Sequence, residues 1–291
     1  MYSNKLYAPL RYPGGKARFA PFIASIMEKN GLCGGHYLEP YAGGGAVALE
    51  LLFHGVAAHI HINDLDSAVF DFWECVKNHP EEMLKLIHDT PINMEQWHYW
   101  REVLRGNVSV GQLERGFATL FMNRTNRSGV LKGGVIGGLA QAGTYKLDAR
   151  FKKDALAKRI EKIAQHSNSI SIYNEDALSL LSRCKEFLPK KSLIYLDPPY
   201  YVKGQGLYRN FYEHKDHEAI AKLLQKKRFG RSWVVSYDNV EEIQTMYEIS
   251  KGLTYGINYT AQTRYIGSEV MFFSEGLVVP DADIPQSKAA A

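Results

Sequence analysis

A glycine-rich loop between an apolar strand and a helix is the feature that most constrains the fold of this 291-residue chain. The stretch HYLEPYAGGGAVALELLFHG (residues 36–55) is typical of a strand, a tight loop and a helix that Gly55 can end. The next stretch, AHIHINDLD (residues 58–66), alternates apolar and polar residues as a strand does, and it places Asp64 near the strand's end. Such a unit indicates a doubly wound α/β sheet, in which ligands bind at the carboxyl ends of the strands.

The same alternation of strands and helices returns in the second half of the chain. Strands followed by helices or turns are predicted within residues 169–181, 192–227 and 232–248. The stretches LTYGINYTAQ (residues 253–262) and SEVMFFS (residues 268–274) look like a last pair of strands. Their connection is short and carries no helix, so we expect this pair to be antiparallel in a mostly parallel sheet.

A mostly helical region separates the two halves of this sheet. It covers residues 67–163, and within it residues 123–146 are so rich in Gly, Asn and Ser that they predict no regular helix. An irregular segment of this length is uncommon unless it is functional or disordered. We therefore predict a main domain from residues 1–66 and 164–280, an insert at 67–163, and a disordered tail at 281–291.

The net charge of +4 is unevenly distributed along the chain. Residues 101–165 contain thirteen Lys and Arg against five Asp and Glu, which gives this part a local charge of +8 and leaves −4 for the remainder. A basic block inside a mildly acidic frame suggests a polyanionic partner, nucleic acid first. A solvated helical surface would show the same pattern, so charge alone leaves both interpretations open.

The composition predicts a soluble intracellular protein with a sizeable core. The chain is 45% hydrophobic, which is enough for one large domain or for one domain that carries an insert. It shows neither a charged and then apolar leader nor an apolar run of membrane-spanning length. The cysteines at 33, 75 and 184 match no zinc pattern and no disulfide framework.

The glycine loop predicts a nucleotide-like ligand but does not match two common motifs. The glycines at 43–45 let a ligand approach the backbone closely. No Lys-Ser or Lys-Thr follows them as in a phosphate-binding loop, and Ala48 breaks the G-x-G-x-x-G pattern. Asp64 can accept both hydroxyls of a ribose, and Glu39 suits a cationic group but would repel a pyrophosphate. These residues favour an adenosyl cofactor such as S-adenosylmethionine over NAD.

The stretch SLIYLDPPYY (residues 192–201) ends an apolar strand in a carboxylate, two prolines and two tyrosines. The prolines remove N–H groups and hold φ at about −65°, so the turn is biased toward hydrogen-bond acceptors. Asp197 and the Pro198 carbonyl can accept the two hydrogens of an exocyclic NH2 group while the Tyr200 ring stacks on its base. Those bonds would aim the nitrogen lone pair at an electrophile. A proline kink that only closes a strand would not explain the flanking Asp and Tyr.

Together these motifs resemble the Dam-like family of DNA adenine methyltransferases, the alpha group of amino-methylating enzymes. EPYAGGG is similar to the family's cofactor motif, INDLD to its ribose-binding acid, NEDA to its adenine-contacting motif and DPPY to its catalytic tetrapeptide. RYPGGK (residues 11–16), HKDHEAIAKLL and RYIGSEVMFFS look like further family elements. The order also matches, with the insert between the cofactor and catalytic motifs, and the resemblance covers roughly residues 8–275.

The resemblance implies a Rossmann-like, seven-stranded S-adenosylmethionine-dependent methyltransferase sheet, with a mostly helical target-recognition insert. It implies methyl transfer to the N6 amine of a flipped adenine in double-stranded DNA. The implied cofactor-binding residues are Tyr12, Lys16, Glu39, Tyr41, Gly43, Gly45, Asp64 and Asp176. The implied catalytic residues are Asp197, Pro198 and Tyr200. The expected DNA-binding residues, at the place of the family's DNA-contacting hairpin, are Arg124, Arg127, Val130, Lys132 and Lys146.

Three other interpretations stay open at this point. An RNA or ribosomal base methyltransferase would share the cofactor motifs but would usually lack the long insert. A catalytically inactive nucleic-acid-binding relative would have lost a catalytic position, and an NAD oxidoreductase would need a hydride-handling site. The segment 127–132 departs from the best-known GATC methylases, so the recognition sequence is open, as is a cognate restriction nuclease. We expect a monomer without a metal in the cytoplasm of a prokaryotic cell or a phage-infected host.

Overall fold

The computed structural model describes residues 7–12, 16–202, 212–259 and 265–280. Residues 13–15 of the RYPGGK motif, the first residue of RYIGSEVMFFS and the predicted tail at 281–291 lie outside the described residues. Among the residues described, no helix has the length and apolar character that crossing a membrane requires.

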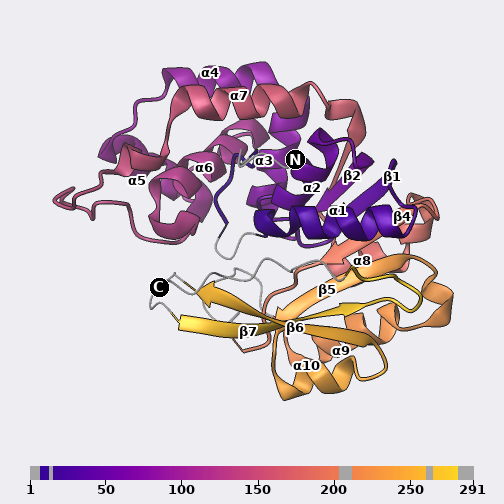
Figure 1. Ribbon diagram of the computed structural model, residues 1–291. Coiled ribbons are helices and arrows are strands. Elements are labelled where there is room, and N and C mark those ends of the chain that lie inside the picture. The colour runs from indigo at the N-terminus through magenta and orange to yellow at the C-terminus, as the bar shows by residue number, and fades with distance from the viewer. Residues whose placement is uncertain (1–6, 13–15, 203–211, 260–264, 281–291) are drawn as a thin grey trace.

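A seven-stranded sheet runs through the described part of the chain, in the order β3-β2-β1-β4-β5-β7-β6 (Figure 1). The strands are β1 (Gly35–Glu39), β2 (Ala57–Asn63), β3 (Ile170–Tyr173), β4 (Ser192–Leu196), β5 (Ser232–Asp238), β6 (Lys251–Tyr259) and β7 (Tyr265–Phe273). The first five lie parallel, whereas β7 runs antiparallel to both β5 and β6. The predicted doubly wound sheet with an antiparallel last strand is confirmed.

Helices cover both faces of this sheet (Figure 1). They are α1 (Ala20–Lys29), α2 (Ala46–Phe53), α3 (Ser67–Asn78), α4 (Pro80–Asp89), α5 (Met94–Arg105), α6 (Gln112–Thr125), α7 (Lys153–Ala164), α8 (Ala177–Ser182), α9 (His214–Leu224) and α10 (Glu241–Met246). The hydrophobic cluster on one face contains α1, α2, α3 and α7, and the cluster on the other contains α8, α9 and α10.

Alternate residues of the strands feed these two clusters. Along β4, Leu193 and Tyr195 join the cluster with α1 and α2, whereas Ile194 and Leu196 join the cluster with α9. Successive side chains of a strand point to opposite faces, so a sheet covered on both sides requires apolar residues in an unbroken run. The run SLIYL meets this requirement, and it leaves the polar residues to the strand's carboxyl end.

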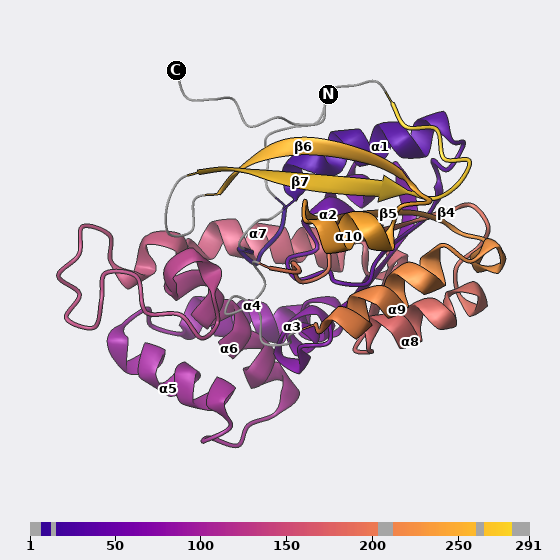
Figure 2. The ribbon, with the colours of Figure 1, turned by 90° about the horizontal axis from the view of Figure 1, so that it is seen from below.

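The region predicted to be a mostly helical insert contains α3 to α7. Helix α6 packs against α3 and α5, and α4 packs against α7; Figures 1 and 2 show α4, α5 and α6 together on one side of the molecule. Residues 123–125, which we expected in the irregular segment, instead form the last turn of α6. Their side chains are buried in tertiary contacts, which stabilise helix where the local sequence favours a loop. The irregular segment therefore begins at Asn126.

Candidate active site

A pocket lies at the carboxyl ends of β1, β2 and β4, the edge at which a doubly wound sheet binds its ligand. The residues predicted from the sequence that line it are Tyr12, Lys16, Glu39, Tyr41, Gly45, Asp64 and Asp197. Gly43 and Asp176, which were also predicted to bind the cofactor, are not among the lining residues. The structure thus brings most of the predicted cofactor residues and the predicted catalytic Asp197 into one space.

The turn from β1 into α2 depends on glycine at two positions. Gly43 and Gly45 have φ angles of +47° and +56°, a region that residues with a side chain rarely adopt. A Cβ on Gly43 would lie 2.7 Å from the ring of Tyr12, and one on Gly45 would lie 3.0 Å from the ring of Trp73. Gly43 therefore lets the Tyr12 ring lie against the loop, although Gly43 itself does not line the pocket.

Asp64 holds this loop from just beyond the end of β2. Its Oδ2 accepts from the backbone N–H of Gly43 at 3.0 Å, and its Oδ1 accepts from that of Asp66 at 2.9 Å. Burial raises the pKa of Asp64 to about 6, because the two hydrogen bonds offset only part of the lost hydration. The half-buried carboxylate lines the pocket, so its remaining lone pairs can accept hydroxyl groups of a ligand.

Glu39 ends β1 and is only 6% exposed. Its Oε1 accepts from the Tyr37 hydroxyl at 3.0 Å and from the N–H of Ala48 at 2.9 Å. Burial raises the pKa of Glu39 to about 8, and the nearby Asp197 carboxylate contributes in the same direction. A cationic ligand group in the pocket would stabilise the ionised form of Glu39, as its predicted role requires.

Asp176 lies at a helix start rather than in the pocket wall. It is exposed, and its Oδ1 accepts from the N–H of Ser179 at 3.1 Å, which caps α8. The neighbouring residues Glu175 and Ala177 line the pocket instead. In the NEDA motif, therefore, Glu175 rather than Asp176 is the acid that lines the pocket.

Asp197 follows β4 directly and is half-buried at the pocket. Its Oδ1 accepts from the Ser236 hydroxyl at 2.8 Å and lies 3.5 Å from Nζ of Lys16. Burial raises the pKa of Asp197, and the positive charge of Lys16 opposes that rise. Pro199 lines the pocket, whereas Pro198, which was predicted to be catalytic, is buried beside it.

A second acid, which the sequence patterns did not single out, holds the turn after Asp197. Asp238 is the last residue of β5, and its carboxylate accepts from the N–H of Tyr201 at 2.9 Å and from that of Val202 at 3.0 Å. These bonds satisfy two consecutive backbone donors that follow Tyr200, and they fix the direction of the chain there. The available signal was an Asp at the carboxyl end of the strand that neighbours SLIYL.

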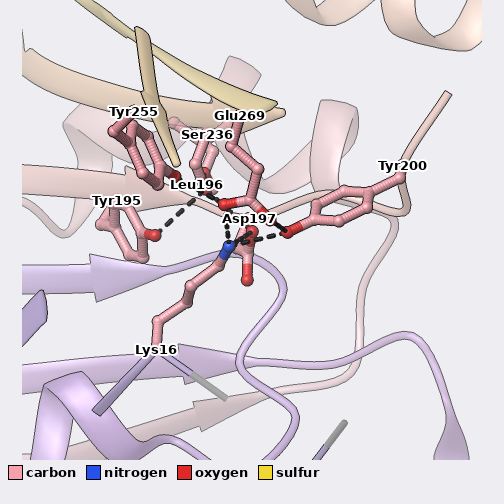
Figure 3. A network of polar contacts seen from close by, with 8 residues as sticks. All are labelled: Lys16, Tyr195, Leu196, Asp197, Tyr200, Ser236, Tyr255 and Glu269. Carbon is pink, nitrogen blue, oxygen red and sulfur yellow. Dashed lines mark hydrogen bonds and ion pairs between the residues drawn. The ribbon is translucent and has the colours of Figure 1, made fainter. Parts of the chain in front are cut away.

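Lys16, which was predicted to bind the cofactor, is buried and contacts the predicted catalytic residues Asp197 and Tyr200 (Figure 3). Lys16 is 5% exposed, and its Nζ donates to the Tyr200 hydroxyl at 2.7 Å and to Oε2 of Glu269 at 2.9 Å. The Tyr200 hydroxyl in turn donates to Oε1 of Glu269. We call Lys16, Asp197, Tyr200 and Glu269 the Lys16 network.

Glu269 is the member of this network that the sequence patterns did not identify. It lies in β7, is fully buried and also accepts from the Tyr255 hydroxyl at 2.7 Å. Burial would raise the pKa of Glu269, but Lys16 and the hydrogen bonds outweigh burial and leave the pKa below its usual value. A single acid inside the apolar run SEVMFFS was an available signal, because a buried carboxylate requires a cation or several donors.

Arg124 lies inside the protein rather than on an accessible surface. It is 8% exposed; its Nε donates to the Pro9 carbonyl at 2.6 Å and its Nη2 to the Ala8 carbonyl at 3.3 Å. This arrangement does not support the DNA contact expected for Arg124. Its guanidinium instead anchors the backbone that leads into the RYPGGK motif.

The other predicted DNA-binding residues are accessible. Arg127, Lys132 and Lys146 are exposed, and Val130 is half-buried. Arg127 begins a short 3-10 turn, and its Nε donates to the Val135 carbonyl at 3.3 Å. The charged ends of these side chains therefore lie where a phosphate or a base edge can reach them.

The irregular segment is fastened to the N-terminal motif. The Asn123 side chain exchanges two hydrogen bonds with the backbone of Arg11, each of 2.7 Å, and also donates to the Gly129 carbonyl at 2.8 Å. Gly129 has φ +77°, and a Cβ there would lie 2.4 Å from the Arg11 carbonyl oxygen. Because Arg11 precedes Tyr12, the segment predicted to read DNA is connected directly to the pocket wall.

The family of the chain follows from a comparison with known sequences. A family model described as D12 class N6 adenine-specific DNA methyltransferase matches residues 12–264. The chain belongs to this family. It is 24% identical over 214 residues to the Type II methyltransferase M1.LlaDCHI of Lactococcus lactis subsp. cremoris, covering 70% of this chain and 69% of that protein. It is also 24% identical over 259 residues to the Type II methyltransferase M.MjaIII of Methanocaldococcus jannaschii, covering 82% and 87%.

Two solved structures show a more distant likeness. A putative RNA methyltransferase from Pyrococcus horikoshii is 11% identical, covers 94% of this chain and 90% of its own, and has a TM-score of 0.41. A putative class I S-adenosylmethionine-dependent methyltransferase from Listeria monocytogenes is 10% identical, with 99% and 66% covered and a TM-score of 0.37. The resemblance to DNA adenine methyltransferases is confirmed by the family match.

Proposed function

We propose that the chain is a site-specific DNA adenine methyltransferase, which transfers a methyl group from S-adenosylmethionine to the N6 amine of a flipped adenine in double-stranded DNA. The family supports this reaction class. The observation that carries the proposal is the position of Asp197, in the wall of the same pocket as Asp64 and Glu39. Asp197 therefore borders the proposed binding site of the methyl donor, and it is also the first residue of the turn that we propose holds the base.

The residues around the pocket fit S-adenosylmethionine, which supplies a methyl group on a positively charged sulfur. The buried Glu39 suits its cationic amino end, and the half-buried Asp64 suits its ribose hydroxyls. The glycine loop lets the ligand approach the backbone between them. Within the described ranges, no group of three or more His, Cys, Asp or Glu residues could hold a metal ion.

The turn after β4 presents the amine. The contacts that the described residues make with the Asp197 carboxylate use Oδ1, which leaves Oδ2 for one amine hydrogen. The Pro198 carbonyl takes the second hydrogen and the Tyr200 ring stacks on the base. The nitrogen lone pair would then point out of the ring plane, toward the methyl group that S-adenosylmethionine would supply. The new nitrogen–carbon bond would replace the carbon–sulfur bond, and one amine proton would pass to solvent. Lys16 assists because its positive charge favours the ionised form of the half-buried Asp197, which is the form that accepts hydrogen bonds.

The exposed residues of the irregular segment supply the DNA contacts in this proposal. Arg127, Lys132 and Lys146 bind phosphates or guanine edges, and Val130 wedges into the duplex as the adenine leaves it. Arg124 makes no DNA contact in this proposal and anchors the backbone of residues 8 and 9 instead. We extend the proposal to a cytoplasmic enzyme of a prokaryotic cell or phage-infected host, with a cognate restriction nuclease as a candidate partner.

The test is methyl transfer by the wild-type chain and by Asp197→Ala, on duplex DNA, RNA and free nucleoside, with the modified bases sequenced. We expect duplex DNA to be the substrate and Asp197→Ala to lose at least about a hundredfold in rate. Cofactor affinity by calorimetry and the melting temperature should stay close to wild type, because Glu269 still neutralises Lys16. Asp89→Ala, which removes an exposed carboxylate at the end of α4, is the matched control.

Two results would contradict the proposal. Activity of Asp197→Ala within about tenfold of wild type, roughly 1.4 kcal/mol of barrier, would show that Asp197 is not catalytic. Methylation of RNA but not of duplex DNA would replace the proposed substrate with that of the alternative interpretation.

A further inference from the structure

The Lys16 network contains one buried carboxylate, one half-buried carboxylate and one buried ammonium, and Lys16 contacts the two carboxylates unequally. Nζ of Lys16 lies 2.9 Å from Oε2 of Glu269 but 3.5 Å from Oδ1 of Asp197. Glu269 is fully buried and Asp197 is 26% exposed. Lys16 therefore makes its shorter and more buried ion pair with Glu269, and its contact with Asp197 is longer and more exposed to solvent (Figure 3).

The placement of Glu269 explains this asymmetry. Strand β7 runs antiparallel beside β5, in the register that pairs Glu269 with Asp238, so the first part of β7 reaches the catalytic edge of the sheet. Lys16, Tyr200 and Tyr255 each donate to Glu269 there. A carboxylate that accepts several hydrogen bonds is held in its ionised form and in one orientation.

We propose that Glu269 is a positioning residue, which holds Lys16 back from Asp197 and fixes the ring of Tyr200 at the proposed base site. This inference rests on the proposed function, because it assigns a purpose to two residues of that reaction. Glu269 itself does not line the pocket, so it acts through Lys16 and Tyr200 rather than on a substrate. Asp197 would pair tightly with Lys16 if Glu269 were absent, and a paired carboxylate is a poorer acceptor for an amine.

The first test is Glu269→Gln, which keeps the shape and an acceptor oxygen but removes the charge. Carbon-13 NMR titration of the protein alone, with the Asp197 carboxyl signal assigned by comparison with Asp197→Asn, measures the consequence. Losing a like charge and gaining a closer Lys16 both stabilise ionised Asp197, so we expect its titration midpoint to fall by about one pH unit or more. The acidic limb of the kcat profile should move to lower pH with it, and kcat should fall at least about tenfold while KM for S-adenosylmethionine stays within about twofold.

Glu50→Gln is the matched control, since Glu50 is a buried carboxylate in α2 outside the Lys16 network. Glu50→Gln should leave the Asp197 titration unchanged. An equal shift in both variants would overturn the proposal, as would a titration and a kcat of Glu269→Gln that match those of the wild type.

Tyr200→Phe tests whether Glu269 fixes the ring of Tyr200. This variant removes no charge, and the test applies even if Glu269→Gln does not fold. Loss of the hydroxyl frees the ring from Glu269, so kcat should fall about tenfold with KM unchanged. An unchanged kcat would overturn the role in fixing Tyr200.

The two proposals fail in different ways. The titration needs neither DNA nor S-adenosylmethionine, so it reports on Glu269 whatever the wild-type chain methylates. Absence of methyl transfer by the wild type, together with the expected shift in the Asp197 titration, would refute the proposed function but would support the part of the inference in which Glu269 holds Lys16 back from Asp197. Methyl transfer to duplex DNA by the wild type, together with an unshifted Asp197 titration in Glu269→Gln, would support the proposed function and refute the positioning role of Glu269.

Discussion

The buried carboxyl group of Glu39 should release a proton when a cationic ligand binds in the pocket, and this release can be measured without catalysis. Because burial raises the pKa of Glu39 to about 8, this residue carries a proton near neutral pH. A cationic group of a ligand beside it stabilises the ionised form and lowers that pKa, so binding expels the proton. Asp64, with a pKa of about 6, is already mostly ionised near neutral pH and contributes little to such a release.

We predict that S-adenosylmethionine binding near pH 7 releases most of one proton. Isothermal calorimetry in two buffers of different ionisation enthalpy measures this number. Since Glu39 is ionised in the free protein above its pKa of about 8, the release should vanish as pH rises through that value. Glu39→Gln should release no proton and bind at least about tenfold more weakly. The same release from wild type and Glu39→Gln would assign the proton to another group.

At the scale of elements, the segment between α6 and α7 depends on one close backbone approach. The Gly129 turn lies against the carbonyl of Arg11, and Asn123 bonds to the backbone of both. Ser128 has φ +54° beside Gly129 at +77°, so the turn is already in a conformation that most residues disfavour. A small change at Gly129 must therefore move either this turn or Arg11, and with Arg11 the pocket residue Tyr12.

Gly129→Ala tests this coupling, with Gly134→Ala as its matched control. The added Cβ at 129 meets the Arg11 carbonyl oxygen at 2.4 Å, whereas a Cβ at 134 meets nothing within 4 Å and its φ is not in the left-handed region. We expect Gly129→Ala to weaken both DNA binding, by fluorescence anisotropy, and S-adenosylmethionine binding, by calorimetry, each by about tenfold or more. Gly134→Ala should change neither. If the two variants behave alike, the segment and the pocket are not coupled through this contact.

The elements that could be predicted from the sequence are those whose pattern is local. Residues 36–66 show a strand, a glycine turn, a helix and a second strand in succession, and the pocket residues Glu39 and Asp64 follow from this pattern. The end of α6 could not be predicted, because Arg124 is helical on account of its buried contacts with residues 8 and 9. Glu269 and Asp238 were missed for a related reason. Asp238 matters because β5 lies beside β4, and Glu269 matters because β7 brings it to Lys16 and Tyr200. The local sequence shows an acid at each place but not these neighbours.

At the scale of the whole molecule, one hydrophobic cluster contains residues from both sides of the predicted domain boundary. Phe121 of α6 belongs to the same hydrophobic cluster as Tyr37 and Leu193 of the sheet. Trp73 of α3 also donates from its ring N–H to the Gly43 carbonyl at 2.9 Å, so the start of the predicted insert supports the glycine loop. The target-recognition role predicted for residues 67–163 would thus be carried by helices that also complete one face of the sheet.

A shared core predicts that the insert and the sheet unfold together. Phe121→Ala removes a fully buried ring that packs against Trp100, Phe117 and Phe151, which should cost about 3–5 kcal/mol of unfolding free energy. If both regions open in one cooperative step, hydrogen exchange by mass spectrometry should show faster exchange of the slowest amides in β1 and β4 as well as in α5 and α6. Tyr99→Ala, which truncates a partly exposed ring of α5, should change either set by less than about 1 kcal/mol. Faster exchange in Phe121→Ala confined to α5 and α6 would show that the insert is a separate folding unit, and the common hydrophobic cluster would then be an interface between two domains.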